Sequence, residues 1–259
     1  MGDGFERERV MHELRRRRLT VLGSARIAPR MQRITLGGAD LEGFAAPGPA
    51  DHVKMLFPGP DGEVMRDYTP LAFRPEAMGG PELVVDFVLH GADGHGGPAA
   101  SWAAAAEPGD EMTVAGPRGS LLPPAEVGRA ILVADESALP SVARWLEALG
   151  AAPVLGLFSI EDPGTSSYLD EYEAEHRTLH WFSGEDRDAR VAEALRAAQI
   201  DDRTLVFLAG EAGALIPLRR YLRRELGLPK EQVEVHGYWK RGVIALDHHA
   251  PLDPGDPDD

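Results

Sequence analysis

Four consecutive residues, Arg66 to Thr69, carry side chains well suited to binding a cofactor. They follow a strand-like segment, residues 51–58. On an extended backbone successive side chains alternate between faces, so Arg66 and Tyr68 share one face and Thr69 turns to the other or lies at a bend. A cation for a phosphate, an aromatic ring for stacking and a hydroxyl near a reactive nitrogen are the groups that bind a flavin. The same residues are also typical of an edge strand that uses them for solubility and packing, so both interpretations stay open.

A glycine-rich turn further along the chain could bind a pyrophosphate. The apolar segment 83–91 predicts a short strand, and the glycine-rich segment 94–97 follows it. Pro98 and the alanine-rich residues 99–106 are typical of a helix N-terminus. The free backbone N–H groups and the positive dipole end of such a helix would suit a pyrophosphate.

The order of predicted elements divides the chain near residue 122. Before this point, short strands separated by Gly and Pro, with one helix, indicate an antiparallel barrel. These strands are expected at residues 20–24, 31–36, 53–57, 83–89 and 112–115. After it, strands and helices alternate, which indicates a parallel sheet with covering helices. The expected strands are 130–134, 153–159, 180–182, 204–209 and 233–236, and the expected helices are 139–149, 191–198 and 215–226.

We therefore predict a two-domain β plus α/β protein. Residues 1–122 form an antiparallel flavin-binding barrel, and residues 123–246 form a nucleotide-binding-like domain on a parallel sheet. The Pro- and Asp-rich residues 247–259 are expected to form a disordered acidic tail.

The composition excludes several classes of protein. The 259 residues carry a formal net charge of −15, which argues against a nucleic-acid partner because phosphate contacts need a basic surface. No cysteine is present, so disulfides, Cys-ligated iron–sulfur clusters and thiol nucleophiles are excluded. No apolar run is long enough for a membrane span and no secretory signal is recognisable, so we expect a cytoplasmic protein.

Two charged segments are interpreted without assigning them a ligand. The one basic run, Arg15 to Arg18, is expected to be a solvated segment ahead of the first strand. In the tail, His248 and His249 stand beside Asp247 and could bind a metal ion. Adjacent residues on a disordered segment rarely preorganise such a site, so no metal site is expected.

The loop after the first strand of the second half is acidic, whereas nicotinamide-binding reductases usually have a glycine-rich loop for the pyrophosphate at this position. Its residues Asp135, Glu136 and Ser137 can equally be helix caps. A carboxylate beside a pyrophosphate would repel it by about 1 kcal/mol in a wet site, so weak nicotinamide binding is expected. Glu161 follows the next strand, where an acid can hold a ribose 2′-hydroxyl and repel a 2′-phosphate. This acid slightly favours NADH over NADPH as the donor.

Together these motifs resemble the siderophore-interacting protein family, the FAD-containing ferric-siderophore reductases of the ferredoxin-reductase-like group. The resemblance spans roughly residues 20–242. It is carried by residues 51–58, 66–69, 90–91, 97–99, 102–103, 116–120, 134–140 and 209–211. The last anchor, residues 236–242, is similar to the family's terminal Gly-Tyr-Trp-x-x-Gly signature. Leu71 departs from the family pattern, which often has a second Arg here, so flavin affinity or substrate charge preference could differ.

The resemblance implies which residues meet each ligand. Those expected to bind FAD are Arg66, Asp67, Tyr68, Thr69, Asp86, His90, Gly97, Pro98, Ala99, Ala100, Ser101 and Trp239. Those expected to dock an anionic ferric siderophore are Lys54, Arg118, Lys240 and Arg241, each of which could instead be a solvated surface cation. The donor nucleotide is expected at Asp135, Glu136, Ser137 and Glu161. No protein residue is expected to act as a catalytic group or to bind a metal, because the flavin carries the electrons.

The implied reaction moves electrons from NADH, NADPH or ferredoxin through FAD to Fe(III) held in a siderophore. The Fe(II) that results is bound far more weakly by hard oxygen donors and dissociates. Two alternatives stay open. One is a general flavin-dependent oxidoreductase with another acceptor, and the other is a non-catalytic module that binds flavin or siderophore.

Overall fold

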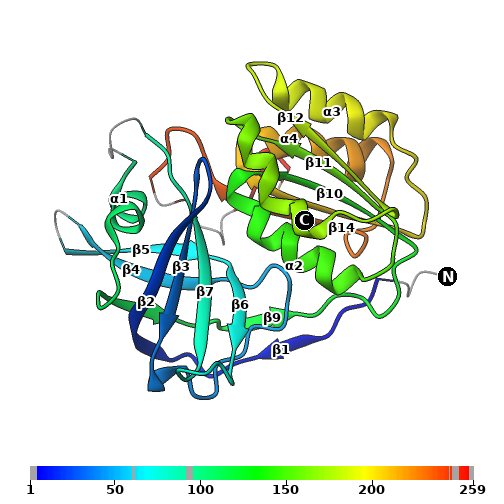
Figure 1. The fold of residues 1–259 in the computed structure, drawn as a ribbon. Coiled ribbons are helices and arrows are strands. Elements are labelled where there is room, and N and C mark those ends of the chain that lie inside the picture. Colours follow the sequence, from blue (N-terminus) through cyan, green and yellow to red (C-terminus); the bar gives the residue numbers. More distant parts are fainter. Residues whose placement is uncertain (1–4, 60–61, 92–95, 245, 247–250, 257–259) are drawn as a thin grey trace. The chain divides into compact units, whose positions relative to one another are not determined.

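The computed structural model describes residues 5–59, 62–91, 96–244, 246 and 251–256. The chain forms two compact units (Figure 1). The antiparallel unit contains Glu8–Leu122, and the parallel unit contains residues 5–7 and most of the chain from Pro123 onward. The predicted turn residues Gly94 and His95 and the tail residues Asp247, His248 and His249 lie outside the described residues.

The antiparallel unit is built on a seven-stranded sheet with strand order β5-β4-β8-β2-β3-β7-β6. Its strands are β2 (Arg16–Ala28), β3 (Met31–Gly37), β4 (Val53–Gly59), β5 (Gly62–Tyr68), β6 (Pro70–Arg74), β7 (Glu82–Val88) and β8 (Glu111–Ala115). β5 and β6 stand at opposite ends of this order, yet only Thr69 separates them in the chain. The sheet must therefore curl until its edges meet, as Figure 1 shows, and the predicted antiparallel barrel is confirmed as a curled sheet.

A second, two-stranded sheet belongs to the same unit. It pairs β1 (Arg9–Met11) with β9 (Gly119–Leu121) in antiparallel register. The apolar patterns of the sequence predict none of the strands β1, β6 and β9, because a strand of this kind buries too few residues to leave an apolar signal. For β5 the sequence indicates only an extended backbone at Arg66 to Thr69.

Alternation along the strands decides which side chains form the core of the antiparallel unit. In β2, Leu19 and Val21 are buried while the residues between and beside them face solvent. Phe57 of β4 joins them, and α1 (Pro98–Ala105) adds the buried Ala103. Full burial of a large apolar side chain contributes about 1.5–3 kcal/mol, so this alternation is the main source of stability for the sheet.

The basic run is not a solvated segment ahead of the first strand, so that prediction is wrong. Arg16, Arg17 and Arg18 belong to β2, and Arg17 is only 4% exposed. Its guanidinium donates to the carbonyl oxygen of Gly116 over 2.9 Å and lies 5.2 Å from the ring centroid of Phe44. Charge composition alone does not show that strand alternation turns the middle arginine inward.

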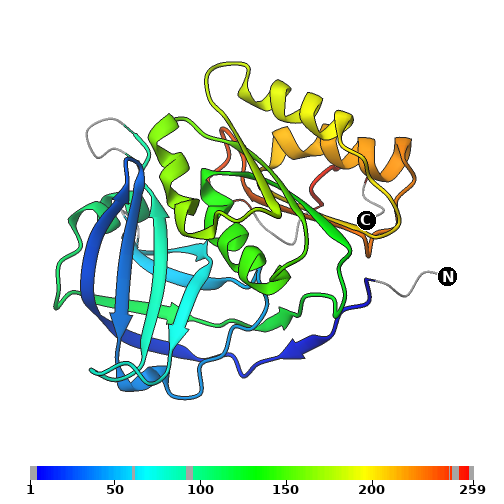
Figure 2. The same ribbon diagram turned by 45° about the vertical axis from the view of Figure 1, so that its right-hand side comes forward.

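The parallel unit contains a five-stranded parallel sheet with strand order β12-β11-β10-β13-β14. Its strands are β10 (Arg129–Asp135), β11 (Val154–Ser159), β12 (Arg177–Phe182), β13 (Thr204–Glu211) and β14 (Val233–Trp239). Its helices are α2 (Leu139–Leu149), α3 (Arg187–Ala197) and α4 (Ala212–Arg220). Ile131 and Val133 of β10 share a hydrophobic core with α3 and α4, while α2 covers the other face (Figure 2). The predicted parallel sheet with covering helices is confirmed.

The helical segments differ from their predicted ranges mainly at their ends. The helix predicted at 215–226 begins at Ala212, contains Pro217 and passes into a π-helical turn, η5 (Tyr221–Glu225). A proline lacks the N–H that the helix ladder uses, so a change of helical pattern after it is expected. The described residues also contain the 3₁₀ segments η1 (Ala39–Leu41), η3 (Glu136–Ala138) and η4 (Pro163–Tyr172). None of the helices in the described part of the chain has both the length and the apolar character of a membrane span.

Residues 251–256 differ from the expected disordered tail. Asp253 is 5% exposed, and its carboxylate accepts a hydrogen bond from Arg220 Nε over 2.6 Å. Asp256 accepts a hydrogen bond from Arg224 Nε over 2.7 Å. Both arginines come from α4 and the turn after it, and the composition of the tail does not reveal such distant partners.

Candidate functional site

Tyr68 and Thr69 lie where the curled sheet closes on itself. Tyr68 ends β5, and the buried Thr69 links it to β6. The Tyr68 ring packs 4.3 Å from Phe87 and 6.0 Å from Phe57, measured between ring centroids. Burial raises the pKa of the Tyr68 hydroxyl above its ordinary value, so this group keeps its proton at neutral pH and can donate a hydrogen bond.

The residues before Tyr68 follow the expected alternation. Arg66 is half-buried like Tyr68, whereas Asp67 between them is exposed. The Arg66 guanidinium donates to the carbonyl oxygen of Met65 over 2.7 Å, and Asp67 accepts a hydrogen bond from Lys54 Nζ over 2.9 Å. An arginine has five N–H donors, so the contact with Met65 leaves others for a phosphate.

An aromatic cluster joins Tyr68 to α1. The Trp102 ring of α1 lies 5.7 Å from Phe57 and 5.8 Å from Phe87, the same two rings that contact Tyr68. The Arg-x-Tyr-Thr segment and the helix after the glycine turn are therefore two parts of one region, although they are well separated in sequence.

The approach to α1 requires glycine at one position and favours it at the next. A Cβ atom on Gly96 would lie 1.9 Å from the carbonyl oxygen of His90, which no side chain tolerates without a backbone shift. Gly97 has a φ angle of 86°, and among the described residues no atom beyond Gly97 and its chain neighbours lies within 4 Å of the place where its Cβ would stand. His90 is exposed, but partial desolvation, aided by the charge of Arg30, lowers its pKa below the ordinary value.

The first turn of α1 leaves hydrogen-bond donors for an anion. Pro98 starts the helix and has no N–H, and the first helical bond runs from Ser101 N to Gly97 O over 3.0 Å. The amides of Ala99 and Ala100 precede that bond, and such amides have no acceptor within the helix. This turn therefore fits the pyrophosphate of a dinucleotide.

Asp86, a predicted cofactor residue, has a partner within the protein. Arg33 Nε donates to Asp86 Oδ1 and a terminal nitrogen of Arg33 donates to Asp86 Oδ2, both over 2.8 Å. The two residues stand opposite each other on β3 and β7, and the Asp86 side chain is completely buried. The pattern of the sequence does not identify Arg33, since only the strand register places it opposite the acid.

Two of the four predicted docking cations lie in the antiparallel unit. Lys54 stands opposite Ala115, the last residue of β8, and Arg118 is in the turn that follows. The strand register therefore brings these two cations to one part of the unit. Arg118 is exposed, and its guanidinium has no ion-pair partner in the part of the chain that the structure describes. The other two, Lys240 and Arg241, follow β14 in the parallel unit.

The acidic loop after β10 is bound by donors of its own unit. Asp135 accepts hydrogen bonds from Ser137 N over 2.8 Å, Ser137 Oγ over 2.5 Å, Glu211 N over 2.8 Å and Trp239 Nε1 over 2.8 Å. Burial raises the pKa of Asp135, although each of these hydrogen bonds favours its charged form. The interpretation of Asp135 as a cap is confirmed, because its carboxylate accepts from Ser137 N at the start of η3. Trp239, predicted to contact the cofactor, is 39% exposed and uses its indole N–H in this cluster.

Glu136 holds the loop after β11. Its Oε1 accepts hydrogen bonds from Glu161 N over 3.1 Å and Thr165 Oγ1 over 3.2 Å, and the residue is 6% exposed. The charges of Asp135 and Glu136 are thus compensated in part by donors of the same unit, which the sequence argument for repulsion did not include.

Glu161 has a basic neighbour at the end of β11. Its carboxylate lies 3.6 Å from a terminal nitrogen of Arg187, the first residue of α3. The next residue, Asp188, accepts a hydrogen bond from Ser159 Oγ over 2.6 Å. An acid and a cation that could each contact a nucleotide ribose therefore lie side by side.

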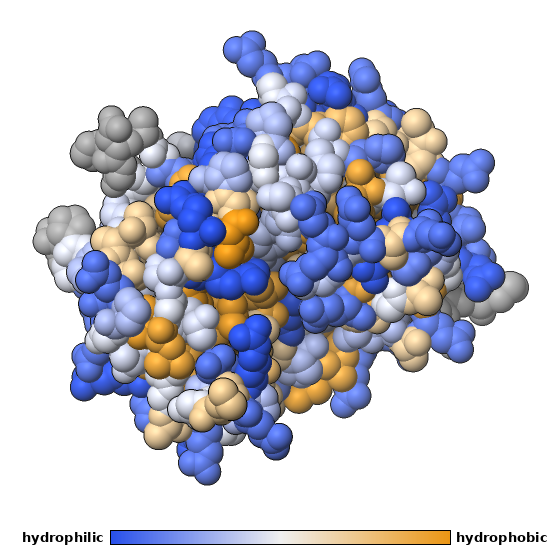
Figure 3. Space-filling view, in the orientation of Figure 1, coloured by the Kyte–Doolittle hydropathy of each residue, from blue (hydrophilic) through white to orange (hydrophobic). Residues whose placement is uncertain are grey.

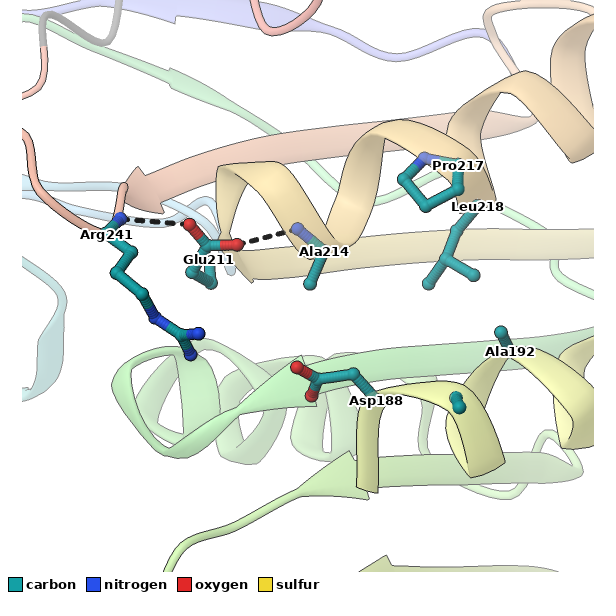
Figure 4. A pocket seen from close by; sticks show the side chains of 8 residues that line it. Asp188, Ala192, Glu211, Ala214, Pro217, Leu218 and Arg241 are labelled. Carbon is teal, nitrogen blue, oxygen red and sulfur yellow. Dashed lines mark hydrogen bonds between the residues drawn. The ribbon is translucent and has the colours of Figure 1, made fainter. Parts of the chain in front are cut away.

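An open pocket of about 310 Å³ lies between the first turns of α3 and α4 (Figure 4). It is lined by Asp188, Ala189, Ala192, Glu211, Ala214, Pro217, Leu218 and Arg241. Glu211 accepts from Ala214 N over 2.6 Å and from Arg241 N over 3.0 Å, so it caps α4 and fixes the backbone of Arg241. Figure 4 shows the Arg241 guanidinium and the Asp188 carboxylate on the same side of the pocket. Sequence reasoning missed Asp188 as a lining residue, although an acid in the first turn of a helix is a usable signal.

The chain matches two family models and several known proteins. Residues 127–242 match the model described as siderophore-interacting protein, and residues 20–64 and 61–121 match the siderophore-interacting FAD-binding domain. The NADPH-dependent ferric-chelate reductase of Escherichia coli (strain K12) is 35% identical over 257 residues, covering 90% of this chain and 96% of that protein. The ferric vibriobactin reductase ViuB of Vibrio cholerae serotype O1 is 26% identical, covering 86% and 89%. A siderophore utilization protein from T. fusca superposes with a TM-score of 0.84 at 38% identity, covering 95% of this chain and all of that one.

Proposed function

The chain belongs to the siderophore-interacting protein family, and from this premise we propose that it is an FAD-dependent reductase of ferric siderophores. Two similar proteins are named as reductases of a ferric chelate and of ferric vibriobactin, which supports an oxidoreductase acting on such chelates. The observation that carries the proposal is the aromatic cluster of Phe57, Tyr68, Phe87 and Trp102, because it joins the two predicted halves of the flavin site.

The antiparallel unit offers groups that fit FAD. The first turn of α1 supplies amide donors for the pyrophosphate, and the open space at Gly97 admits an approaching phosphate. Arg66 has donors for a phosphate oxygen, and the Tyr68 hydroxyl and Thr69 can contact the ring system. Asp67, Asp86, His90 and Trp239 remain proposed contacts. Asp86 then acts through a carboxylate that Arg33 already orients.

Bound FAD would supply the electron transfer from a donor to Fe(III), which no side chain of the protein can perform. The protein residues bind and orient. Arg118, together with Lys54 in its exposed pair with Asp67, is proposed to give an acidic protein the local positive charge that an anionic chelate needs for docking, and Lys240 and Arg241 are proposed for the same task.

The electron donor is proposed to be a nicotinamide nucleotide held by the parallel unit. Ser137 and Glu161 lie at the carboxyl ends of β10 and β11, where open parallel sheets bind their ligands. Glu161 favours NADH, whereas its neighbour Arg187 suits the 2′-phosphate of NADPH, and the E. coli relative is named as NADPH-dependent. We therefore treat both nucleotides as candidate donors. Asp135 and Glu136 shape the loop, and ferredoxin stays an alternative donor.

Anaerobic spectroscopy of the purified protein tests the proposal. The flavin spectrum is recorded, NADH and NADPH are added in separate experiments, and a ferric catecholate is then added with an Fe(II) trap. We expect bleaching by at least one nucleotide and recovery of the spectrum as Fe(II) appears. A protein that neither retains nor binds FAD would contradict the whole proposal.

Other outcomes select the alternatives. Bleaching without Fe(II) formation, combined with rapid reduction of a quinone, indicates a general flavin-dependent oxidoreductase. Bound FAD that neither nucleotide reduces, but that reduced ferredoxin does, assigns a protein donor. FAD that no donor reduces indicates a binding module. The cytoplasmic location expected from the sequence is part of the proposal and is checked by cell fractionation.

A further inference from the structure

The turn that carries Arg118 is held from two sides. It lies between β8 and β9, in the gap where the N-terminal segment changes its pairing partner from one strand to the other. The guanidinium of the buried Arg17 donates to the carbonyl oxygen of Gly116 over 2.9 Å. The backbone N–H of His12 donates to the carbonyl oxygen of Arg118 itself over 3.0 Å. The backbone at Arg118 is thus fixed, while its side chain remains exposed.

A chain of hydrogen bonds links the end of this turn to a buried acid. Ser120 Oγ donates to Asp51 Oδ2 over 2.5 Å and lies 2.7 Å from His12 Nε2. A serine hydroxyl has a single hydrogen atom, which here goes to the carboxylate. His12 must therefore donate its Nε2–H to Ser120 Oγ.

The buried end of this hydrogen-bond chain, at Asp51, is closely packed. Asp51 is 4% exposed and Ser120 is 2% exposed. Asp51 Oδ2 also accepts from Gly48 N over 2.9 Å, and a Cβ atom on Gly48 would lie 2.4 Å from Asp51 Oδ1. Burial raises the pKa of Asp51 despite these donors. A carboxylate confined in this way gives Ser120 one defined position.

His12 contacts both Arg118 and Ser120 and so couples their positions. Its backbone N–H donates to Arg118 O, and its ring contacts Ser120 of β9, two residues further along the sequence. Fixing the backbone of a cation before it meets an anion reduces the ordering cost of binding. The Arg118 guanidinium has no ion-pair partner among the described residues, so the turn holds its backbone and leaves its charge available.

We propose that His12, Ser120 and Asp51 are positioning residues that fix Arg118 for the docking of an anionic ferric chelate. The proposal rests on the proposed function for the role of Arg118. It assigns tasks to three residues that touch neither chelate nor flavin in the scheme above. Loss of these hydrogen bonds weakens the docking of anionic chelates and leaves the docking of neutral chelates unaffected.

Binding of redox-inert gallium(III) chelates to the FAD-loaded protein tests the proposal without relying on turnover. Calorimetry gives Kd for the anionic gallium(III) tris-catecholate and for a neutral gallium(III) tris-hydroxamate. The variants are Arg118→Ala, Ser120→Ala, His12→Ala, His12→Gln and the double variant Arg118→Ala with Ser120→Ala. Thr204→Val is the matched control, because Thr204 also donates a buried hydroxyl to a carboxylate, Asp201, over 2.6 Å.

We expect Arg118→Ala, Ser120→Ala and His12→Ala each to weaken the anionic complex about tenfold, as loss of an aligned docking charge does. The neutral complex keeps its Kd within about twofold in every variant. His12→Gln retains a side-chain N–H donor and restores most of the affinity. The double variant binds no more weakly than Arg118→Ala alone, and Thr204→Val loses stability but no affinity.

The proposal would be overturned by unchanged anionic affinity in Ser120→Ala, by equal weakening of both chelates, or by multiplied effects in the double variant. If Ser120→Ala does not fold, the contrast between His12→Ala and His12→Gln decides. Unchanged affinity in Arg118→Ala, in a wild type that reduces ferric chelates, overturns the positioning proposal and leaves the proposed function standing. If the wild type binds the chelate through Arg118 but reduces no ferric chelate, the proposed function is overturned and the positioning proposal stands.

Discussion

Acids at the carboxyl ends of β10 and β13 in the parallel unit have a different kind of partner from two buried acids of the antiparallel unit. Asp135 and Glu211 together accept four backbone N–H groups, which come from a loop, from the last residue of β13 and from first helical turns. In the antiparallel unit, Asp86 is held by the side chain of Arg33, and Asp51 by Ser120 with one amide from Gly48.

The difference follows from the two sheet types. A parallel sheet alternates with helices, and the first turn of each helix has amides without acceptors at the end where the strands stop. An acid at this end of the sheet can accept hydrogen bonds from these nearby amides. In an antiparallel sheet the strand amides are used in the ladder, so a buried acid needs a side chain from a neighbouring strand. The comparison teaches that an acidic loop can be structural where it resembles a ligand site, and that a strand acid depends on one remote residue.

The largest expected effect comes from removing the best-connected acid. Asp135→Ala leaves two amides, a hydroxyl and the Trp239 indole N–H without their acceptor, so we expect the free energy of unfolding to fall by about 4 kcal/mol. The control is Asp162→Ala, which removes the cap at Gly164 N and costs about 1 kcal/mol. Urea unfolding of both variants measures the difference. Equal losses would show that the acidic loop does not depend on this cluster.

The next effect tests the side-chain partner in the antiparallel unit. Arg33→Ala removes a bidentate partner from the completely buried Asp86 side chain, and we expect a loss of about 3 kcal/mol. Lys54→Ala breaks the exposed pair with Asp67 and is expected to cost less than about 1 kcal/mol. Urea unfolding is again the measurement. A loss in Lys54→Ala as large as that in Arg33→Ala would contradict the dependence on burial.

A pH series separates two buried acids with opposite pKa directions. Burial acts to raise the pKa of Glu234, but His236 and Arg7 outweigh it and hold this pKa at about 2, below its ordinary value of 4.5. The stability from Glu234 is therefore complete above pH 4.5 and is lost as the pH falls toward 2. Between pH 4.5 and 3 the wild type should lose about 2 kcal/mol that Glu234→Gln does not lose.

For Asp51 the change in stability with pH has the opposite sign, because burial raises the pKa of this acid above 3.8. The stability that Asp51 contributes is complete below pH 3.8 and is lost as the pH rises through its folded-state pKa. Asp51→Asn should therefore not show the loss of stability that the wild type shows as the pH rises. Urea unfolding at several pH values measures both slopes. Slopes of the same sign for the two variants would contradict this assignment.

The smallest expected effect concerns an acid whose neighbour is a cation on α3. If Glu161 and Arg187 choose the donor, Arg187→Ala raises KM for NADPH about fivefold and changes KM for NADH little, because only NADPH carries the 2′-phosphate. Glu161→Ala shifts the preference in the opposite direction. Arg196→Ala, at the other end of α3, is the control. Steady-state kinetics with both nucleotides gives the ratio, and an unchanged ratio in both variants would remove these residues from donor recognition.

The periodic parts of the fold are well predicted from the sequence. The helix at 139–149 is found with the predicted bounds, and the strands around it agree within a few residues. In these segments the apolar residues repeat with the period of the element. The start of α1 at Pro98 is predicted for a similar reason, since proline after glycine marks a helix start in the local sequence.

The partners of charged residues are much less predictable. Arg17 is buried, Asp86 is paired with Arg33, and Asp253 is held by Arg220, although the sequence favours solvent or ligand for each of them. Each contact joins residues that are distant in the chain. Local patterns report which face a residue occupies, but not which residue lies opposite.

The sequence by itself determined the order of the elements, the two sheet types and the motifs that resemble the siderophore-interacting family. These properties depend on local periodicity, on turn chemistry and on residue types close together in the chain. Only the tertiary structure decided that Tyr68 and Trp102 share one aromatic cluster, that the acidic loop is bound by amides of its own unit, and that His12 and Asp51 meet at Ser120. The physical reason is that sheet closure and strand register set these distances, and both arise from the packing of the whole unit.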